Sequence, residues 1–184
     1  MRNKLRETKF KSAIFLARDL FVAAAIFLWV GPAGATQPAT VTGGGTGTFY
    51  ADLDGDGEID GSHFGFAVTR NPNGVVLGHF MCQMAGNRDF LGLKLMLVEG
   101  QVSNASFTPA SVTFGGTATV NLANGTAFTE LPFIVTVTAS GPGLGTLQLT
   151  VIGAFDGVPG DTIPGDNNYS LPVETVATGL ISIE

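Results

Sequence analysis

Cysteine is almost missing from this chain, since Cys82 is the only one among 184 residues. A single cysteine excludes an intrachain disulfide, and it excludes zinc sites that are built from several thiolates. Cys82 falls on the apolar side of an alternating stretch over Val75–Met84. We therefore expect a buried, unreactive thiol, with an intermolecular bridge as the alternative.

Basic residues are scarce after the first 35 positions. Only Arg70, Arg88 and Lys94 remain there as strong bases against 13 acids, which gives a formal charge of −10. Such an acidic protein does not bind nucleic acid through phosphate contacts, and it has no basic patch for anionic lipid. Any partner is therefore expected to be an extracellular or cell-surface molecule of unknown identity.

Helical periodicity is also missing after residue 35. No stretch sustains apolar residues at i, i+3, i+4 and i+7 with caps at its ends. Short runs of alternating character, separated by turn residues, occur instead, and 24 of the chain's 26 glycines lie among them. This pattern predicts a single all-β domain over residues 36–184, an antiparallel β-sandwich or barrel of about 8–10 strands.

The expected strands can be placed by their flanking turns. Asn71–Gly74, 86–89 and Asn124–Gly125 read as turns, and 156–168 reads as a loop rich in glycine and proline. Leu91, Leu93, Leu95 and Leu97 alternate and are expected to share one face. The expected strands cover Thr40–Ala51, His63–Arg70, Val75–Met84, Phe90–Val98, Gly100–Phe107, Ser111–Asn121, Phe133–Ala139, Leu147–Val151 and Thr175–Glu184.

The first 35 residues have the pattern of a secretory signal peptide. A basic segment precedes an apolar run of 11 residues, Leu20–Val30, which is too short for a membrane span of about 20 residues. Ala33 and Ala35 supply the small residues of a cleavage site. We expect a secreted, periplasmic or cell-surface protein, with an uncleaved N-terminal anchor as the alternative. The basic residues are Arg2, Lys4, Arg6, Lys9, Lys11 and Arg18.

One acidic loop, Asp52-Leu-Asp54-Gly-Asp56-Gly-Glu58-Ile-Asp60, is typical of a calcium site. Calcium takes six to eight oxygen ligands at ~2.3–2.6 Å, and a loop of this pattern supplies them at alternate positions. The expected ligands are the side chains of Asp52, Asp54, Asp56 and Asp60 and the main-chain carbonyl of Glu58. Gly57 stands where the chain must turn sharply, often with positive φ. The alternative is an acidic hairpin loop without a metal.

The loop does not match an EF-hand. His63 stands at its twelfth position, where an EF-hand has glutamate, and Phe64–Val68 alternates as a strand does. The loop is more similar to the calcium loops between strands in integrin-type propeller repeats and thrombospondin type-3 repeats.

Other polar residues suggest sites less strongly. His63 is close to Asp60 in the sequence, but zinc usually needs three or four nitrogen or sulfur ligands. Asp156, Asp161 and Asp166 recur every five residues and are either turn residues or a second, weak cation site. The chain contains no Gly-x-Ser-x-Gly nucleophile motif.

Six short strand and turn signatures follow one another along the chain: Val41–Thr46, Phe64–Val68, Gly78–Phe80, Phe114–Asn121, Pro132–Thr138 and Thr178–Glu184. In this order they resemble those of a family of small exported bacterial β-domains labelled post-COAP. The resemblance spans nearly all of residues 40–184, and it implies an exported β-rich module of undetermined function with no catalytic residues to carry over. The acidic loop stands where a plain hairpin connection is expected, so the resemblance does not imply calcium.

Three functions remain open at this stage. The first is a secreted, non-enzymatic binding or structural module that one calcium ion stabilises. The second is a carbohydrate-active or other extracellular hydrolase that uses loop carboxylates. The third is a barrel that carries a small apolar ligand. A filled interior favours the module, whereas an open apolar lumen favours the carrier.

We expect the exported protein to begin at Thr36, because the small residues Ala33 and Ala35 occupy the positions that signal peptidase reads. N-terminal sequencing of the exported product measures this directly. A product that still begins near Met1 contradicts the prediction and indicates the uncleaved anchor.

Overall fold

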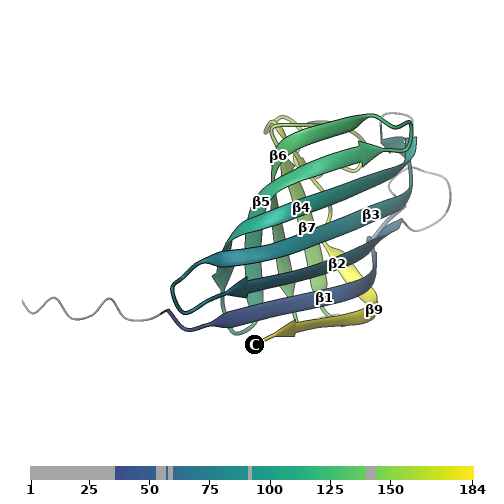
Figure 1. Ribbon diagram of the computed structural model, residues 1–184. Coiled ribbons are helices and arrows are strands. Elements are labelled where there is room, and N and C mark those ends of the chain that lie inside the picture. Colours follow the sequence, from purple (N-terminus) through teal and green to yellow (C-terminus); the bar gives the residue numbers. More distant parts are fainter. Residues whose placement is uncertain (1–35, 53–56, 58–59, 91–92, 140–143) are drawn as a thin grey trace, which may run out of the picture. The chain divides into compact units, whose positions relative to one another are not determined.

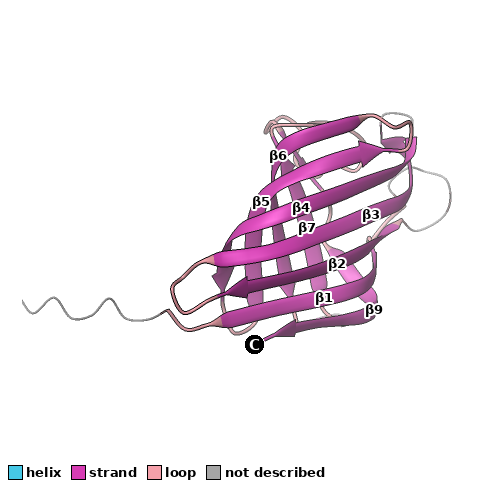
Figure 2. Ribbon diagram, in the orientation of Figure 1, coloured by secondary structure: helices cyan, strands magenta, loops and turns pink. Residues whose placement is uncertain are grey.

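The computed structural model describes residues 36–52, 57, 60–90, 93–139 and 144–184. They belong to one compact unit, Ala35–Glu184. The described residues form strands and loops and contain no helix (Figure 2). The all-β prediction is confirmed. The predicted signal peptide lies outside the described residues.

In the part of the chain that the structure describes, nine strands make up a single antiparallel sheet, whose arrangement can be followed in Figure 1. They are β1 (Ala39–Thr48), β2 (Gly61–Arg70), β3 (Val76–Phe90), β4 (Leu93–Phe107), β5 (Ser111–Leu122), β6 (Ala127–Thr138), β7 (Thr146–Ile152), β8 (Asn168–Ser170) and β9 (Glu174–Ile183).

The sheet closes on itself. Consecutive strands pair from β1 to β7, and β9 returns to pair with β1. One edge of β7 pairs with β6. Its other edge is shared, because β8 pairs with residues 150–152 and β9 pairs with residues 146–147. β8 and β9 therefore act as one interrupted strand that completes a ring.

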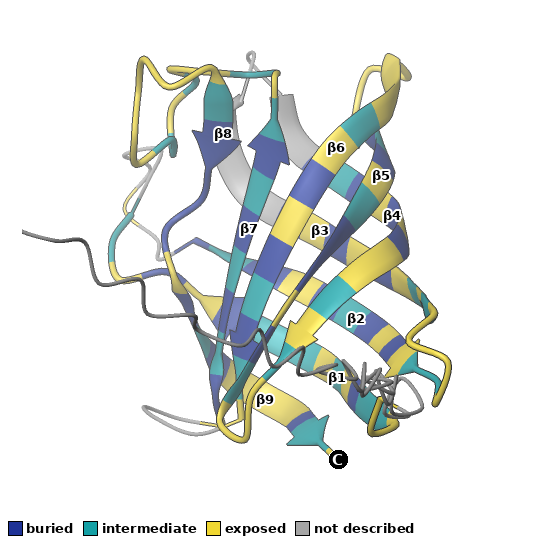
Figure 3. Cartoon of the chain, turned by 90° about the vertical axis from the view of Figure 1, so that its left-hand side faces the viewer, coloured by how far each residue is buried: buried dark blue, intermediate teal, exposed yellow. Residues whose placement is uncertain are grey.

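Alternation of side chains decides which face is inside. In β2, Ser62, Phe64, Phe66 and Val68 are buried, and the residues between them are exposed or half-buried. Figure 3 shows a similar alternation of buried and more exposed positions along β7 and the second half of β6. The even-numbered face of β2 is therefore part of the core.

The predicted turn after β2 forms as the sequence indicates. Asn71 Oδ1 accepts hydrogen bonds from the main-chain N–H groups of Asn73 and Val75, both at 3.0 Å. Gly74 has φ of 80°, which glycine adopts without steric cost. The side chain of Asn71 thus fixes the hairpin between β2 and β3.

Three strand predictions need correction. Residues 86–89 are not a turn, since β3 continues to Phe90 and β4 begins at Leu93. β6 begins at Ala127, six residues before the predicted Phe133. The short β8 was not predicted, because its residues belong to the end of a loop rich in glycine and proline.

The leucine face of β4 is not the core face where the structure describes it. Met96 and Val98 are buried, whereas Leu97 is half-buried. The register explains this, because Met96 pairs with Met84 and Val98 with Cys82. Cys82 itself is buried as predicted.

Phenylalanine side chains fill the middle of the closed sheet. The centroid of Phe80 lies 5.9 Å from that of Phe114 and 5.5 Å from that of Phe133. The centroid of Phe66 lies 5.4 Å from that of Phe114 and 6.1 Å from that of Phe64. These five rings come from four strands and contact one another in the interior, so the core is a packed one.

Two of these rings lie directly over glycines. A Cβ atom on Gly43 would lie 2.3 Å from Cζ of Phe66, and one on Gly100 would lie 2.4 Å from Cε1 of Phe133. Both distances are far below van der Waals contact. The missing side chains therefore make the space that the rings occupy.

We expect Gly100→Ala to destabilise the fold by about 1–3 kcal/mol, the usual cost of an overpacked core. The added methyl group would have to displace the buried Phe133 ring. Urea unfolding measures the free-energy change. Gly65→Ala is the matched control, because a Cβ there meets nothing within 4 Å. Equal unfolding free energies for the two variants would contradict the packing of Phe133 over Gly100.

Candidate functional site

The predicted calcium loop joins β1 to β2. Phe49 N donates to the carbonyl of Asp60 at 2.9 Å and closes the base of the loop. The Asp52 carboxylate turns back into the loop, where Oδ2 accepts a hydrogen bond from Gly57 N at 2.8 Å. Gly57 has φ of 94°, as predicted for the sharp turn.

The two described acids of this loop differ in exposure. Asp52 is half-buried, and Asp60 is buried with 4% of its surface exposed. Asp54, Asp56 and Glu58 lie outside the described residues. Among the residues that the structure describes, no group of three or more potential ligand side chains gathers. The inward turn of Asp52 fits a cation-binding loop, and the calcium site stays a prediction.

His63 does not join Asp60. Asp60 and Ser62 are buried, while His63 is exposed on the opposite face of β2. Its strand neighbours are Thr46 and Gln83. Alternation along the strand separates the two side chains, so they do not form the start of a zinc site.

The aspartates of the 156–168 loop hold their own loop together. Asp161 accepts hydrogen bonds from main-chain N–H groups of Gly157 at 2.8 Å and of Ile163 at 3.1 Å. A third comes from Ser170 N at 3.1 Å. Burial alone would raise the pKa of Asp161, but these three donors outweigh it and lower the pKa.

Asp156 and Asp166 also accept hydrogen bonds from main-chain N–H groups of this loop. Asp156 accepts from Gly165 N at 2.6 Å and from Asn167 N at 3.2 Å. Asp166 accepts from Asn168 N at 2.8 Å. These contacts favour the interpretation as turn residues over a second cation site.

A buried carboxyl group that the sequence analysis missed lies inside the ring of strands. Glu174, the first residue of β9, is fully buried. Ser62 Oγ donates a hydrogen bond to its Oε2 at 2.5 Å. Within the described part of the chain, Oε1 has no hydrogen-bond partner. The sequence signal that could have indicated burial is the spacing: Glu174 stands two residues before Val176, on the same buried face of β9.

The backbone makes room for this carboxyl group. A Cβ on Gly47 would lie 2.1 Å from Oε2 of Glu174, so the glycine leaves the space that the carboxyl group occupies. Burial raises the pKa of Glu174 to about 7, and the hydrogen bond from Ser62 offsets this only in part. Burial and the nearby Glu174 also raise the pKa of the Cys82 thiol far above its ordinary value. The interior therefore holds a largely unreactive thiol beside an acid that titrates near neutrality.

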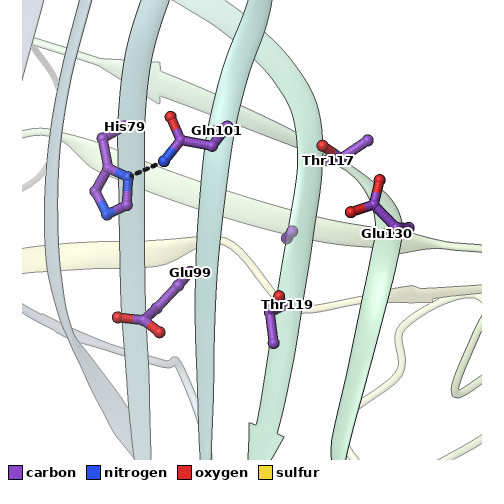
Figure 4. Close-up of a pocket in the computed structure, with 7 residues that line it drawn as sticks. His79, Glu99, Gln101, Thr117, Thr119 and Glu130 are labelled. Carbon is purple, nitrogen blue, oxygen red and sulfur yellow. Dashed lines mark hydrogen bonds between the residues drawn. The ribbon is translucent and has the colours of Figure 1, made fainter.

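A polar groove lies on the outside of the sheet, over β3 to β6. It has a volume of about 340 Å³ and is lined by His79, Glu99, Gln101, Thr117, Ala118, Thr119 and Glu130. Figure 4 shows His79 and Glu99 toward one side, Glu130 toward the other, and the two threonines between them. The His79 Nδ1 and Gln101 Nε2 atoms are 3.2 Å apart. No local sequence pattern marks this set of residues, because its members are far apart in the chain.

No family model, curated protein or solved structure matches the chain. The resemblance to post-COAP domains therefore stays a prediction. No helix among the described residues is long and apolar enough to cross a membrane.

The raised pKa of Glu174 predicts how the free energy of unfolding depends on pH. The folded state keeps this proton up to pH about 7, whereas the ordinary glutamate pKa is 4.5. The folded state thus binds more protons between these values, and the free energy of unfolding falls as pH rises through them. The loss is about 3.5 kcal/mol at most, at ~1.4 kcal/mol per pKa unit.

Glu174→Gln should remove this dependence and raise the free energy of unfolding at pH 8 relative to the unmodified protein. Denaturant unfolding at pH 5 and pH 8 measures it. Glu99→Gln, at an exposed position, is the control and should leave the dependence unchanged. The prediction is wrong if Glu174→Gln and Glu99→Gln show the same difference in unfolding free energy between pH 5 and pH 8.

Proposed function

We propose that this chain is an exported, non-enzymatic β-barrel module that binds a partner at the cell surface or outside the cell. We further propose that one calcium ion stabilises its β1–β2 loop. The observation that carries the first proposal is the filled interior, in which phenylalanine rings pack over Gly43 and Gly100. A packed interior favours a rigid module over a carrier that holds an apolar ligand in a lumen.

The hydrolase alternative has less support. Its loop carboxylates at Asp156, Asp161 and Asp166 accept hydrogen bonds from the main chain of their own loop. Carboxylates that accept these hydrogen bonds stabilise the conformation of the loop. The interior acid Glu174 is fully buried, so it is not placed to meet a polymeric substrate.

Two observations support calcium. Asp52 Oδ2 accepts from Gly57 N, and Gly57 has φ of 94°. Together they give the inward-turned first ligand and the sharp bend that such loops require. Without a cation, four aspartates within nine residues would repel one another. The expected ligands are Asp52, Asp54, Asp56, Asp60 and the Glu58 carbonyl.

Calcium should raise the melting temperature of the protein. Extracellular modules bind calcium with dissociation constants of about 0.1–1 mM. At ten to one hundred times that constant, binding adds about 1.4–2.7 kcal/mol to the unfolding free energy. At about 2–4 °C per kcal/mol, the expected rise is several degrees. Magnesium should have a smaller effect, since it keeps its waters and needs octahedral geometry.

The test compares thermal unfolding in 10 mM calcium, in 10 mM magnesium and in chelator. Asp54→Ala combined with Asp56→Ala should abolish the response and keep the β-sheet circular dichroism spectrum. Glu99→Ala combined with Glu184→Ala removes the same charge from exposed positions outside the loop and should keep the response. If the unmodified protein melts alike in calcium and in chelator, the loop is an acidic hairpin connection without a metal.

A further inference from the structure

The outer groove is built by register across four neighbouring strands. His79 pairs with Gln101, and Gln101 pairs with Thr117, which makes one row across β3, β4 and β5. Glu99 pairs with Thr119 in the next row. Strands lie ~4.8 Å apart, so the span from β3 to β6 is about 14 Å. The groove is thus long enough for an extended ligand that lies across the strands.

A bulge in β6 brings Glu130 to this groove. Ala118 pairs with Leu131 and Val120 with Phe128, so two residues of β6, Thr129 and Glu130, stand opposite Thr119 alone. Glu130 has φ of 59°, a left-handed conformation that costs energy in a residue other than glycine. Bulges re-aim side chains, and here Glu130 faces the groove from the side opposite to His79 (Figure 4).

The lining selects among ligand classes. Six of its seven residues are polar, and none of them is lysine or arginine, so an apolar or an anionic ligand is disfavoured beside Glu99 and Glu130. Within the described part of the chain, no three histidine, cysteine, aspartate or glutamate side chains gather as they would around a metal ion.

The polar side chains that line the groove suit a ligand that carries hydroxyl groups. Gln101, Thr117 and Thr119 each both donate and accept hydrogen bonds, and neutral histidine does the same. Glu99 and Glu130 accept hydrogen bonds from hydroxyl groups. A volume of about 340 Å³ is at the low end of small-ligand sites, roughly 300–1,000 Å³. Only a ligand in which most groups both donate and accept can use the whole lining.

We propose that this groove binds a short segment of neutral glycan. The inference rests on the proposed function, because it supplies the ligand class for a non-enzymatic binding module. Gln101, Thr117 and Thr119 contact the sugar hydroxyls along the floor, and Glu99 and Glu130 accept hydrogen bonds from hydroxyls at its two sides. The lining residues include no phenylalanine, tyrosine or tryptophan to stack on a sugar ring, which predicts modest affinity.

The test titrates the full-length chain with a panel of neutral tetrasaccharides that differ in linkage, followed by NMR of the side chains of His79 and Gln101. At least one tetrasaccharide should bind with a dissociation constant below ~10 mM. The same oligomer carrying carboxylate groups should bind at least tenfold more weakly, because Glu99 and Glu130 repel it. If no neutral tetrasaccharide shifts these signals at 10 mM, the proposal is overturned.

Two variants separate binding from folding. Glu130→Gly removes the carboxylate and relieves the left-handed strain, so binding should weaken at least fivefold while the melting temperature stays the same or rises. Gln101→Ala should also weaken binding at least fivefold. Gln83→Ala, at an exposed position of β3, is the matched control for Gln101→Ala and should bind as the unmodified protein does. Equal affinities across all three variants would overturn the site.

The outcomes for the groove and for the module are distinguishable. The calcium response of melting temperature does not involve the groove, so it can persist when glycan binding fails. Cleavage of the bound tetrasaccharide, followed by chromatography, would instead overturn the non-enzymatic function and keep the location of the binding site.

Discussion

The closed sheet depends on packing aromatic rings over glycines. Closing a sheet on itself leaves a narrow interior, which side chains of unequal size must fill without voids. Phe66 lies over Gly43, and Phe133 reaches across β5 to lie over Gly100. Each ring fills space that the glycine leaves empty. The abundance of glycine in the strands is therefore a packing requirement here, although glycine alone weakens a strand.

A packed interior makes any buried polar group expensive. Glu174 is a buried acidic side chain in this interior, and its surroundings show the cost of burying it. Gly47 leaves room for the carboxyl group, Ser62 donates one hydrogen bond, and the pKa rises to about 7. Such a group reduces stability above neutral pH. The outer face carries no comparable cost, because water solvates the side chains of the groove.

The fold class and most strands could be predicted from the sequence, because alternation and turn chemistry are local signals. The even-numbered face of β2 and the Asn71–Gly74 hairpin are examples. The face of β4 that points into the core could not be predicted, because four alternating leucines outweigh Met96 and Val98 in the sequence pattern. Pairing with β3 decides that face. The groove depends on register and on a bulge at Glu130, neither of which has a local signature.

The acidic loop is the one site that local sequence could indicate, and the structure suggests how it would act on the whole fold. Asp60 ends the loop, and its carbonyl accepts a hydrogen bond from Phe49 N. Phe49 in turn is buried in the core with 4% of its surface exposed. A cation bound in the loop, as proposed above, would therefore also hold the pairing of β1 with β2 at this end. Because β1 joins β2 to the closing strand β9, stabilising that end stabilises the closure of the sheet.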